Sequence, residues 1–238
     1  MFISEELLLK SLIQFNIVPS REQIEIFDKY ACLLTEWNEK FNLTAIKNPD
    51  DIVIKHFADS LSILKYCNFP EKSKLIDVGT GAGFPGLPLI IMKRGISVTF
   101  LDSTGKKLRF IEEVLNELSL QGETVTGRAE EYGKDDNYRE KFDFATARAV
   151  SELKTISELC IPFLKKDGLF IAMKGSGASE EIENSAKATE ILGGKIERQE
   201  NFEIPSCGER NLIFIRKISQ TPTKYPRNYS QIIKHPLV

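Results

Sequence analysis

Short β-rich runs alternate with amphipathic helical segments from residue 71 onward, and this alternation limits the possible folds more than any other feature of the chain. The first run is Leu75-Ile-Asp-Val78, and the next, after one helical segment, is Val98-Thr-Phe-Leu101. Alternating strands and helices form a parallel sheet with helices on both faces. Further strands are expected at residues 124–126, 142–146 and 169–173, and helices at 85–94, 106–118, 151–164 and 179–192.

Two extended runs close the set, at residues 195–204 and 211–218, with no helical segment between them. This pattern predicts an antiparallel hairpin at the edge of the sheet. The sequence therefore predicts an α/β fold with a doubly wound, mostly parallel seven-stranded sheet. Ligands bind such sheets beyond the carboxyl ends of the strands, so the residues that follow each strand are the candidates for function.

The first 70 residues have a helical pattern instead. Ser4 is a candidate N-cap, and Ser20 and Gln23 have the spacing of a capping box. Asn48 opens a third helix that is expected to extend to Leu64. The chain is therefore divided into a helical N-terminal extension (1–70), a core (71–218) and a basic C-terminal tail (219–238).

Charge is distributed unevenly, although the formal net charge is only -2. From Arg210 to the C-terminus there are six Lys or Arg residues and no Asp or Glu, which leaves 26 basic and 34 acidic residues in the remainder. A basic tail on an acidic body predicts a polyanionic partner met at one face. The alternatives are a solvated tail with incidental charge, or a tail that packs through Tyr225, Ile232 and Leu237 and only stabilises the fold.

Signals for metal binding, disulfides and membrane insertion are lacking in the sequence. The four cysteines form no CxxC pair, and the chain has only two histidines, so zinc-site spacing is not found. The longest apolar stretch, Gly86–Met92, is much shorter than the roughly 20 residues of a membrane span, and the N-terminus is acidic where a signal peptide is basic. We expect a cytoplasmic, monomeric protein without a metal site.

The turn after the first strand carries the strongest functional signal. Asp77-Val-Gly-Thr-Gly-Ala-Gly-Phe-Pro-Gly86 is glycine-rich, which lets the backbone approach a ligand closely. Gly81–Gly86 matches the GxGxxG of dinucleotide sites, but Pro85 removes an amide hydrogen where a pyrophosphate needs donors. Read from Gly79, the pattern is acid-x-Gly-x-Gly-x-Gly, which resembles the first motif of S-adenosylmethionine methyltransferases.

Charged residues follow several of the strands. Asp77 suits the cationic end of S-adenosylmethionine, directly or through water, and Asp102 suits ribose hydroxyls, although it would suit a dinucleotide equally well. After the third strand, Glu130 is either an adenine contact or a helix-start carboxylate. Arg148 and Lys174 follow the fourth and fifth strands and suit a phosphate or the O6/N7 edge of guanine, the alternative being surface salt bridges.

A polar cluster is predicted in the third helix. His56, Asp59 and Ser60 share one helical face by their spacing. Three residues of one helix have poor geometry for a nucleophilic site. We interpret them as a hydrogen-bonded cluster on the helix surface.

Five segments together resemble one family. They are Trp37-Asn-Glu-Lys-Phe-Asn-Leu-Thr44, His56-Phe-Ala-Asp-Ser-Leu61, Asp77–Gly86, Arg148-Ala-Val150 and Tyr225-Pro-Arg227. In this order, and over essentially the whole chain, they are similar to the RsmG (GidB) family of bacterial 16S ribosomal RNA guanine-N7 methyltransferases. The resemblance implies a class I, Rossmann-like enzyme that transfers a methyl group from S-adenosylmethionine to guanine N7 at rRNA position 527. The implied partner is 16S ribosomal RNA or the small ribosomal subunit.

The resemblance also implies roles for individual residues. Cofactor contacts fall on Gly79, Phe84, Ala129, Glu130 and Arg148, and the stretch Asp102, Ser103, Thr104 lies where the ribose is held. Gly81 is expected in the same cofactor loop from the glycine pattern of the turn. The acceptor side is implied to hold Arg128, Arg148, Lys174 and, nearby, His56. After Arg227, the segment Asn228–Pro236 departs from the family's usual Pro-, Gly- and Lys-rich pattern.

The chemistry implied by the resemblance needs few catalytic groups. Guanine N7 carries an in-plane lone pair, so its methylation requires in-line positioning at the sulfonium methyl and no general base. The chain accordingly has neither an Asn-Pro-Pro-Tyr motif nor a Cys after the fourth strand. Three other interpretations are open: a nicotinamide oxidoreductase, a non-catalytic RNA-binding protein and a small-molecule methyltransferase.

Overall fold

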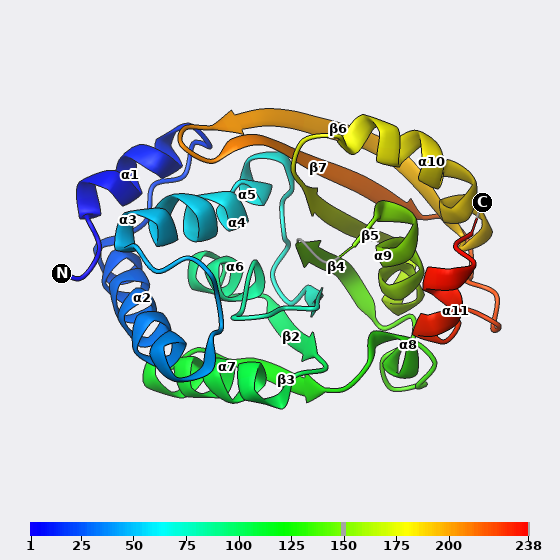
Figure 1. Ribbon diagram of the computed structural model, residues 1–238, viewed down its shortest axis with the longest axis horizontal. Helices are drawn as coiled ribbons and strands as arrows, with labels where there is room; N and C mark the ends of the chain where they lie inside the picture. The colour runs from blue at the N-terminus through cyan, green and yellow to red at the C-terminus, as the bar shows by residue number, and fades with distance from the viewer. Residues whose placement is uncertain (149–150, 238) are drawn as a thin grey trace.

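A seven-stranded sheet forms the centre of the molecule, with strand order β3-β2-β1-β4-β5-β7-β6 (Figure 1). The computed structural model describes residues 1–148 and 151–237. The strands are β1 (Lys74–Val78), β2 (Ser97–Asp102), β3 (Gly122–Thr126), β4 (Phe142–Arg148), β5 (Leu164–Lys174), β6 (Gly194–Ile204) and β7 (Gly208–Lys217). Strands β1 to β5 run parallel, and β7 is antiparallel to both β5 and β6. The predicted sheet and its antiparallel edge hairpin are therefore confirmed.

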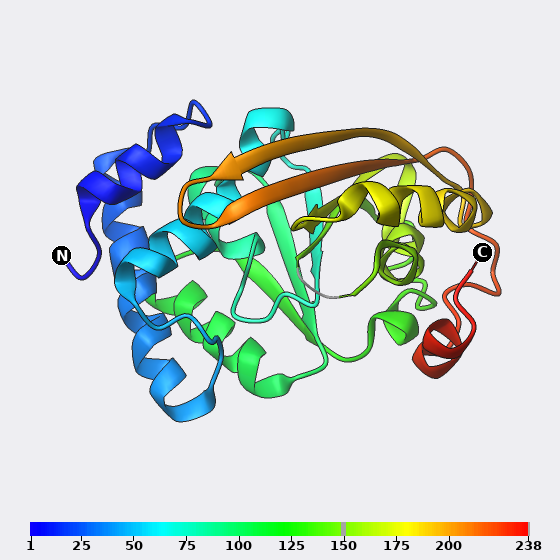
Figure 2. The ribbon, with the colours of Figure 1, turned by 45° about the horizontal axis from the view of Figure 1, so that its top comes forward.

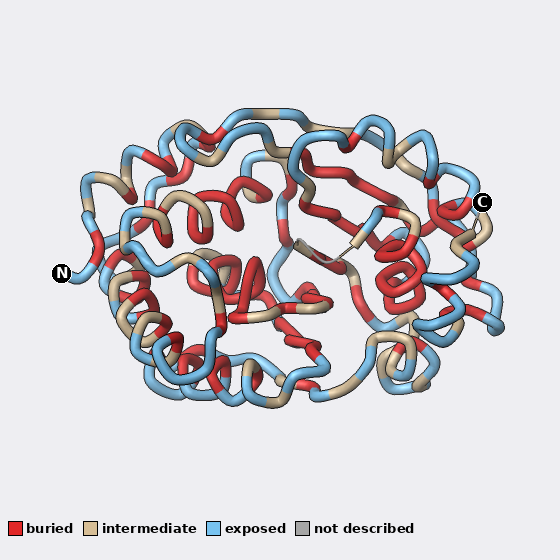
Figure 3. Tube along the Cα trace, viewed as in Figure 1, coloured by how far each residue is buried: buried red, intermediate tan, exposed pale blue. Residues whose placement is uncertain are grey.

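The strand order reverses beside β1, which pairs with β2 on one side and β4 on the other. Residues 75–78 of β1 are buried because helices cover both faces of the sheet, and Figure 3 shows buried chain in the strands and in the helices around them. The carboxyl ends of β1 and β4 thus diverge into a crevice, which is where ligands bind in sheets of this kind.

Helices α6 (Gly86–Met92) and α7 (Gly105–Glu117) cover one face of the sheet, and α9 (Leu153–Cys160) and α10 (Ala178–Ile191) cover the other. The short α8 (Ala129–Tyr132) follows β3. α9 ends earlier than predicted because Pro162 lacks the amide hydrogen that would continue it, and a 3₁₀ turn (Ile161–Phe163) leads directly into a longer β5. In the described part of the chain, no helix has both the length and the apolarity that crossing a membrane requires.

The N-terminal region is helical, as predicted. Its elements are α1 (Glu5–Ile13), α2 (Arg21–Phe41), α3 (Pro49–Asp51), a π-helical segment (Ile52–Ala58), α4 (Asp59–Leu61) and α5 (Ile63–Tyr66). Ser4 caps α1, and the Ser20/Gln23 capping box of α2 is formed in both directions. The third predicted helix is less regular than expected, since its central turns are π-helical.

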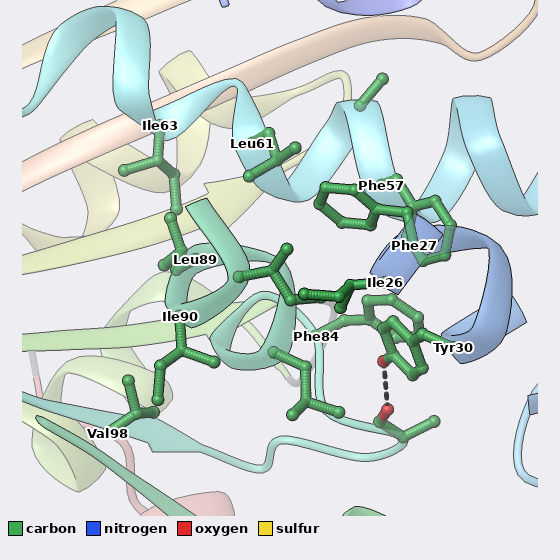
Figure 4. Close-up of a cluster of buried hydrophobic side chains, with 14 of the residues drawn as sticks. Ile26, Phe27, Tyr30, Phe57, Leu61, Ile63, Phe84, Leu89, Ile90 and Val98 are labelled. Carbon is green, nitrogen blue, oxygen red and sulfur yellow. Dashed lines mark hydrogen bonds between the residues drawn. The ribbon is translucent and has the colours of Figure 1, made fainter. Parts of the chain in front are cut away.

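These helices pack onto α6 and α7, which cover one face of the sheet, and do not form a separate unit. Phe27 and Phe57 lie with ring centroids 4.9 Å apart, and Tyr30 stacks on Phe84 of the glycine turn at 5.4 Å (Figure 4). The Tyr30 hydroxyl donates a hydrogen bond of 2.6 Å to the carbonyl of Ala82. The N-terminal extension therefore shares one hydrophobic core with the α6/α7 face and holds the glycine turn directly.

The C-terminal segment, residues 219–237, lies against α9 on the opposite face, where Figures 1 and 2 draw it in orange-red and red. Its helix α11 (Tyr229–Lys234) buries Ile232, and Tyr225 is buried before it. Leu237 is half-buried against the same apolar cluster. The packing of the tail through Tyr225, Ile232 and Leu237 is thus confirmed, and the interpretation of a solvated tail is wrong; whether the tail only stabilises the fold is a separate question.

Candidate active site

Two pockets lie at the carboxyl ends of the strands, and they share Gly79 and Arg148. The β2/β3 pocket has a volume of about 350 Å³ and is lined mainly by Asp102, Ser103, Thr104, Arg128, Ala129, Glu130, Leu159 and Tyr229. The β1/β5 pocket has a volume of about 490 Å³ and is lined mainly by Thr44, Lys55, His56, Asp59, Gly81, Phe84, Lys174 and Arg210. Both volumes suit small organic ligands.

The glycine turn needs glycine at Gly79 and Gly81, because both have left-handed backbone conformations, with φ of 69° and 60°. Two carboxylates, those of Asp77 and Asp102, accept hydrogen bonds from this turn. Asp77 Oδ2 accepts from Thr80 Oγ1 at 2.7 Å and from the Gly86 amide at 3.0 Å. The turn is thereby preorganised, with its backbone presented to both pockets.

Asp77 occupies a different place from the one predicted. It is completely buried, lines neither pocket, and its second oxygen accepts from Thr146 Oγ1 at 3.2 Å. Burial raises the pKa of its carboxyl to about 6, against the lowering effect of its hydrogen bonds. Both oxygens are used inside the fold, so Asp77 shapes the turn and the predicted direct ligand contact is not supported.

Asp102 is both a wall of the β2/β3 pocket and a support of the turn. Its Oδ2 accepts from the Gly81 amide at 3.0 Å, and its Oδ1 accepts from the Thr104 amide at 2.8 Å. A carboxylate has about four lone-pair positions, so each oxygen can still accept one ligand hydroxyl. Ser103, Ala129 and Glu130 line the same pocket, so the structure brings the predicted nucleoside contacts together. This donor and acceptor set fits the ribose and adenine of S-adenosylmethionine.

Arg148 lies at the junction of the two pockets and is firmly anchored. Its Nη1 donates to the Lys55 carbonyl at 3.0 Å and to Asp59 Oδ2 at 2.9 Å, and its guanidinium lies 4.9 Å from the Phe84 ring centroid. Its Nη2 donates to His56 Nδ1 at 2.9 Å. Among the described residues no acceptor meets Nε–H or the second Nη2–H, so two donors remain for a ligand.

His56 is held in one neutral form. Because the Arg148 guanidinium can only donate, Nδ1 of His56 must accept, and Nε2 then donates to Thr44 Oγ1 at 2.9 Å. Burial and the neighbouring Arg148 charge lower the pKa of His56 to about 3. The ring also stacks on Phe84, with centroids 4.2 Å apart. His56 is therefore a structural partner of Arg148 and is unsuited to act as a base at neutral pH.

The predicted surface cluster in the third helix is wrong. His56, Asp59 and Ser60 are all buried, and the Ser60 hydroxyl has no hydrogen-bond partner within the residues that the structure describes. The helix packs against α1 and α6 instead of lying on the surface, so Asp59 turns inward. Its two oxygens bridge Arg148 at 2.9 Å and Arg210 at 3.0 Å.

Asp59 and Arg210 are the site residues that the sequence reasoning missed. Arg210 begins the basic stretch that was assigned to the tail, yet it lies in β7 and lines the β1/β5 pocket. The Asp59–Arg210 pair joins residues 151 positions apart, and no local pattern signals such a contact. One signal was present in the sequence: Asp59 lies in the segment His56–Leu61, which carries the family resemblance. No role was predicted for its carboxylate.

The structure places the cations predicted for the acceptor side in two different pockets. Lys174 lines the β1/β5 pocket together with His56 and Arg148, where it forms a 2.7 Å ion pair with Glu181 and bonds the Ser151 carbonyl. Arg128 lines the β2/β3 pocket instead, because it precedes α8 at the end of β3. The grouping of Arg128 with the acceptor residues is therefore corrected. The Arg148-Ala-Val150 segment continues into residues 149–150, which lie outside the described residues.

Within the described ranges, no group of three or more His, Cys, Asp or Glu side chains is arranged to hold a metal ion. Phe84, predicted as a cofactor contact, lies in the β1/β5 pocket between His56 and Tyr30. Both pockets thus hold charges of either sign: Asp102, Glu130 and Arg128 line the β2/β3 pocket, and Asp59, Lys174 and Arg210 line the β1/β5 pocket.

Comparisons with known proteins agree with this arrangement. The family profile described as "GidB: rRNA small subunit methyltransferase G" matches residues 23–213. A protein of Acetivibrio thermocellus named "Ribosomal RNA small subunit methyltransferase G" is 49% identical over 234 residues, covering 98% of this chain and 96% of that protein. The protein of that name from Thermoanaerobacter sp. is 47% identical over 236 residues, with 98% of each covered. A solved SAM-dependent methyltransferase from Aquifex aeolicus shares the fold, with a TM-score of 0.54 at 16% identity over 74% of this chain and 97% of that one.

Proposed function

The chain belongs to the GidB family of rRNA small subunit methyltransferase G proteins, and we propose that it methylates N7 of guanine 527 in 16S ribosomal RNA. It is an S-adenosylmethionine-dependent methyltransferase. The interpretations as a nicotinamide oxidoreductase and as a non-catalytic RNA-binding protein are therefore rejected. The observation that carries the proposal is that the two pockets meet at Gly79 and Arg148. A methyl donor in one pocket and a base in the other would face each other there.

The β2/β3 pocket is the cofactor side. When bound, S-adenosylmethionine supplies an electrophilic methyl group on a sulfonium. Asp102 accepts from the ribose hydroxyls with its free lone pairs, and Ala129 and Glu130 meet the adenine edge. Gly79 lines both pockets, whereas Gly81 lines only the β1/β5 pocket, where nothing lies within 4 Å of a Cβ built on it.

The β1/β5 pocket is the acceptor side. Arg148, Lys174 and Arg210 are cations in this pocket and suit guanine O6 or the RNA phosphates. A cation beside a sulfonium donor and a product base that becomes positive would oppose the reaction. Asp59 offsets this repulsion because its buried carboxylate lies 2.9 Å from Arg148 and 3.0 Å from Arg210.

No side chain of the acceptor pocket is needed as a base. Guanine N7 has no proton to lose, and His56 is neutral with both ring nitrogens already hydrogen-bonded. The chain's contribution is to position the base, exclude water and keep the junction nearly neutral. Because its substrate is ribosomal RNA, we propose that the protein acts where ribosomes assemble, in the cytoplasm; that it acts as a monomer is a separate proposal.

Transfer of labelled methyl from S-adenosylmethionine to small subunits that lack the modification tests this function. We expect one label per subunit at guanine 527, located by cleavage chemistry specific for N7-methylguanine, and the same assay on free 16S rRNA identifies the preferred substrate. Asp102→Ala should weaken cofactor binding by about tenfold or more, while Asp136→Ala, which removes an exposed carboxylate, should not. Label at another base or atom, or binding of NADH in place of S-adenosylmethionine, would refute the proposal.

A further inference from the structure

One wall of the β2/β3 pocket comes from the C-terminal segment. Tyr229, the first residue of α11, lines this pocket together with Leu159 of α9. The other lining residues follow β1, β2, β3 and β4, as expected for a sheet of this topology. The sequence analysis gave the tail either an RNA contact or a packing role and no part in the cofactor site, so this wall was not predicted.

The segment before Tyr229 is fixed to the rest of the fold through its backbone. Arg139 Nη1 donates to the Tyr225 carbonyl at 2.8 Å, and its Nη2 donates to the Thr221 carbonyl at 2.7 Å. Pro226 packs on Gly133 so closely that a Cβ at Gly133 would lie 2.9 Å from Pro226 Cγ. Gly133 directly follows α8, whose first residues line the pocket, so this contact brings the segment to the pocket rim.

An ion pair fixes the chain two residues before Tyr229. Arg227 Nη2 and Nε donate to the two oxygens of Glu158 at 2.7 and 2.9 Å, and the Arg227 amide donates to the same carboxylate at 2.8 Å. Glu158 is buried and precedes Leu159, the other residue of this wall. Within α11, Ile232 is buried whereas Tyr229 is 39% exposed. The ring is therefore accessible at a position set by a rigid anchor.

The pocket already has polar groups for the polar parts of a nucleoside, namely Asp102 for hydroxyls and Glu130 for amino groups. A purine also presents two apolar faces, which aromatic side chains cover favourably. We propose that Tyr229 packs on the adenine ring of the bound S-adenosylmethionine and is a positioning residue for it. The C-terminal segment would then be part of the cofactor site. This inference rests on the proposed function.

Three variants of the full chain test it: Tyr229→Ala, Tyr229→Phe and, as a matched control, Ile233→Ala. Ile233 is an exposed residue of the same helix and lines no described pocket. We expect Tyr229→Ala to weaken binding of S-adenosylmethionine and adenosine by about 5- to 100-fold, the range for loss of one base–aromatic contact. Tyr229→Phe and Ile233→Ala should stay within about threefold of the parent. In steady-state assays the KM for S-adenosylmethionine should rise while the KM for small subunits stays unchanged.

Results that would contradict the role of Tyr229 can be told apart from a result that would contradict the proposed function. Unchanged cofactor affinity in a folded Tyr229→Ala protein would overturn the inference, and so would an equal loss in Ile233→Ala, which would indicate a packing effect of α11. A rise in the KM for small subunits alone would assign Tyr229 to RNA instead. If the parent protein itself binds no S-adenosylmethionine, the proposed function fails, and this result is distinguishable because it precedes any variant.

Discussion

The two regions outside the sheet are attached to it in different ways. The N-terminal helices cover the α6/α7 face through aromatic packing, with Phe27, Tyr30 and Phe57 all fully buried. The C-terminal segment covers the α9 face through fewer apolar residues and is held by Arg139 and the Arg227–Glu158 ion pair. Each region nevertheless contributes to one pocket: the helices supply His56 and Asp59, and the segment supplies Tyr229.

A region's contribution to the free energy of unfolding is therefore distinct from the side chains it supplies to a pocket. Apolar burial is cooperative and spread over many contacts, whereas a buried ion pair depends on both partners being present. We therefore expect the N-terminal attachment to fail through lost packing and the C-terminal attachment to fail through one unpaired charge.

The largest effect is expected from Phe57→Ala. The Phe57 ring contacts those of Phe27 and Tyr30, with centroids 4.9 and 5.4 Å away, so its removal leaves a cavity between the π-helical segment and α2. The free energy of unfolding should fall by about 3–5 kcal/mol, measured by denaturant titration. Phe2→Ala, at an exposed ring, is the control and should change stability by less than about 0.5 kcal/mol. A small loss for Phe57→Ala would mean that the N-terminal helices are attached mainly by polar contacts.

Arg227→Ala should have the next largest effect. It leaves the buried Glu158 carboxylate without its partner, which costs about 3–5 kcal/mol for a fully buried pair. Because the Arg227 side chain is 22% exposed, we expect a loss nearer about 2–3 kcal/mol. Lys224→Ala, an exposed cation three residues earlier, should leave the melting temperature unchanged. If Arg227→Ala instead kept full stability and lost only RNA affinity, the packed-segment interpretation of this residue would be refuted.

The two histidines lie one in each region and provide a pH comparison. His56 has its pKa lowered to about 3 by burial and by Arg148, from an ordinary value of 6.5. Between these values the unfolded chain binds more protons than the folded one, so stability is lost as the pH falls below 6.5. The buried Asp77, with its pKa raised to about 6, acts in the opposite direction, since its folded form takes up a proton first as the pH falls.

Comparison of variants isolates the histidine effect. From pH 7 to pH 5 the parent should lose about 2 kcal/mol more stability than His56→Asn, because the variant has no imidazole to protonate on unfolding. His235→Asn removes an exposed histidine of the C-terminal segment and should keep the pH dependence of the parent. Equal pH dependence in all three proteins would show that His56 is protonated in the folded state.

The sequence predicted most of the fold because local patterns encode it. Strand and helix alternation, the Ser20 capping box and the glycine turn are each set by neighbouring residues, and all are present. The nucleoside pocket was also predictable, since parallel strands bring Asp102 and Glu130 to the same edge. The helix caps follow from spacing alone.

The remainder depends on contacts between distant parts of the chain. Asp59 reaches Arg210 across 151 positions, and Arg227 reaches Glu158 across 69, so neither pair has a local signature. The role of Asp77 was mispredicted for a related reason: the sequence is the same whether a carboxylate at the end of a strand faces a ligand or faces the turn that follows the strand. Charge counting likewise treated Arg210 and Arg227 as free cations, although both are paired inside the fold.

The smallest effect concerns the charges that remain free on the C-terminal segment. Lys224 and Lys234 are exposed and form no ion pair among the described residues, whereas Arg227 is committed to Glu158. If both lysines meet RNA phosphates, the Lys224→Ala/Lys234→Ala double variant should flatten the slope of log affinity against log salt by up to about 2, at roughly 0.7–0.9 per contact. Stability and S-adenosylmethionine affinity should be unchanged, because Tyr229 and its anchor are intact. A salt slope equal to that of the parent would limit this segment to the cofactor pocket and leave the RNA to the cations of the β1/β5 pocket.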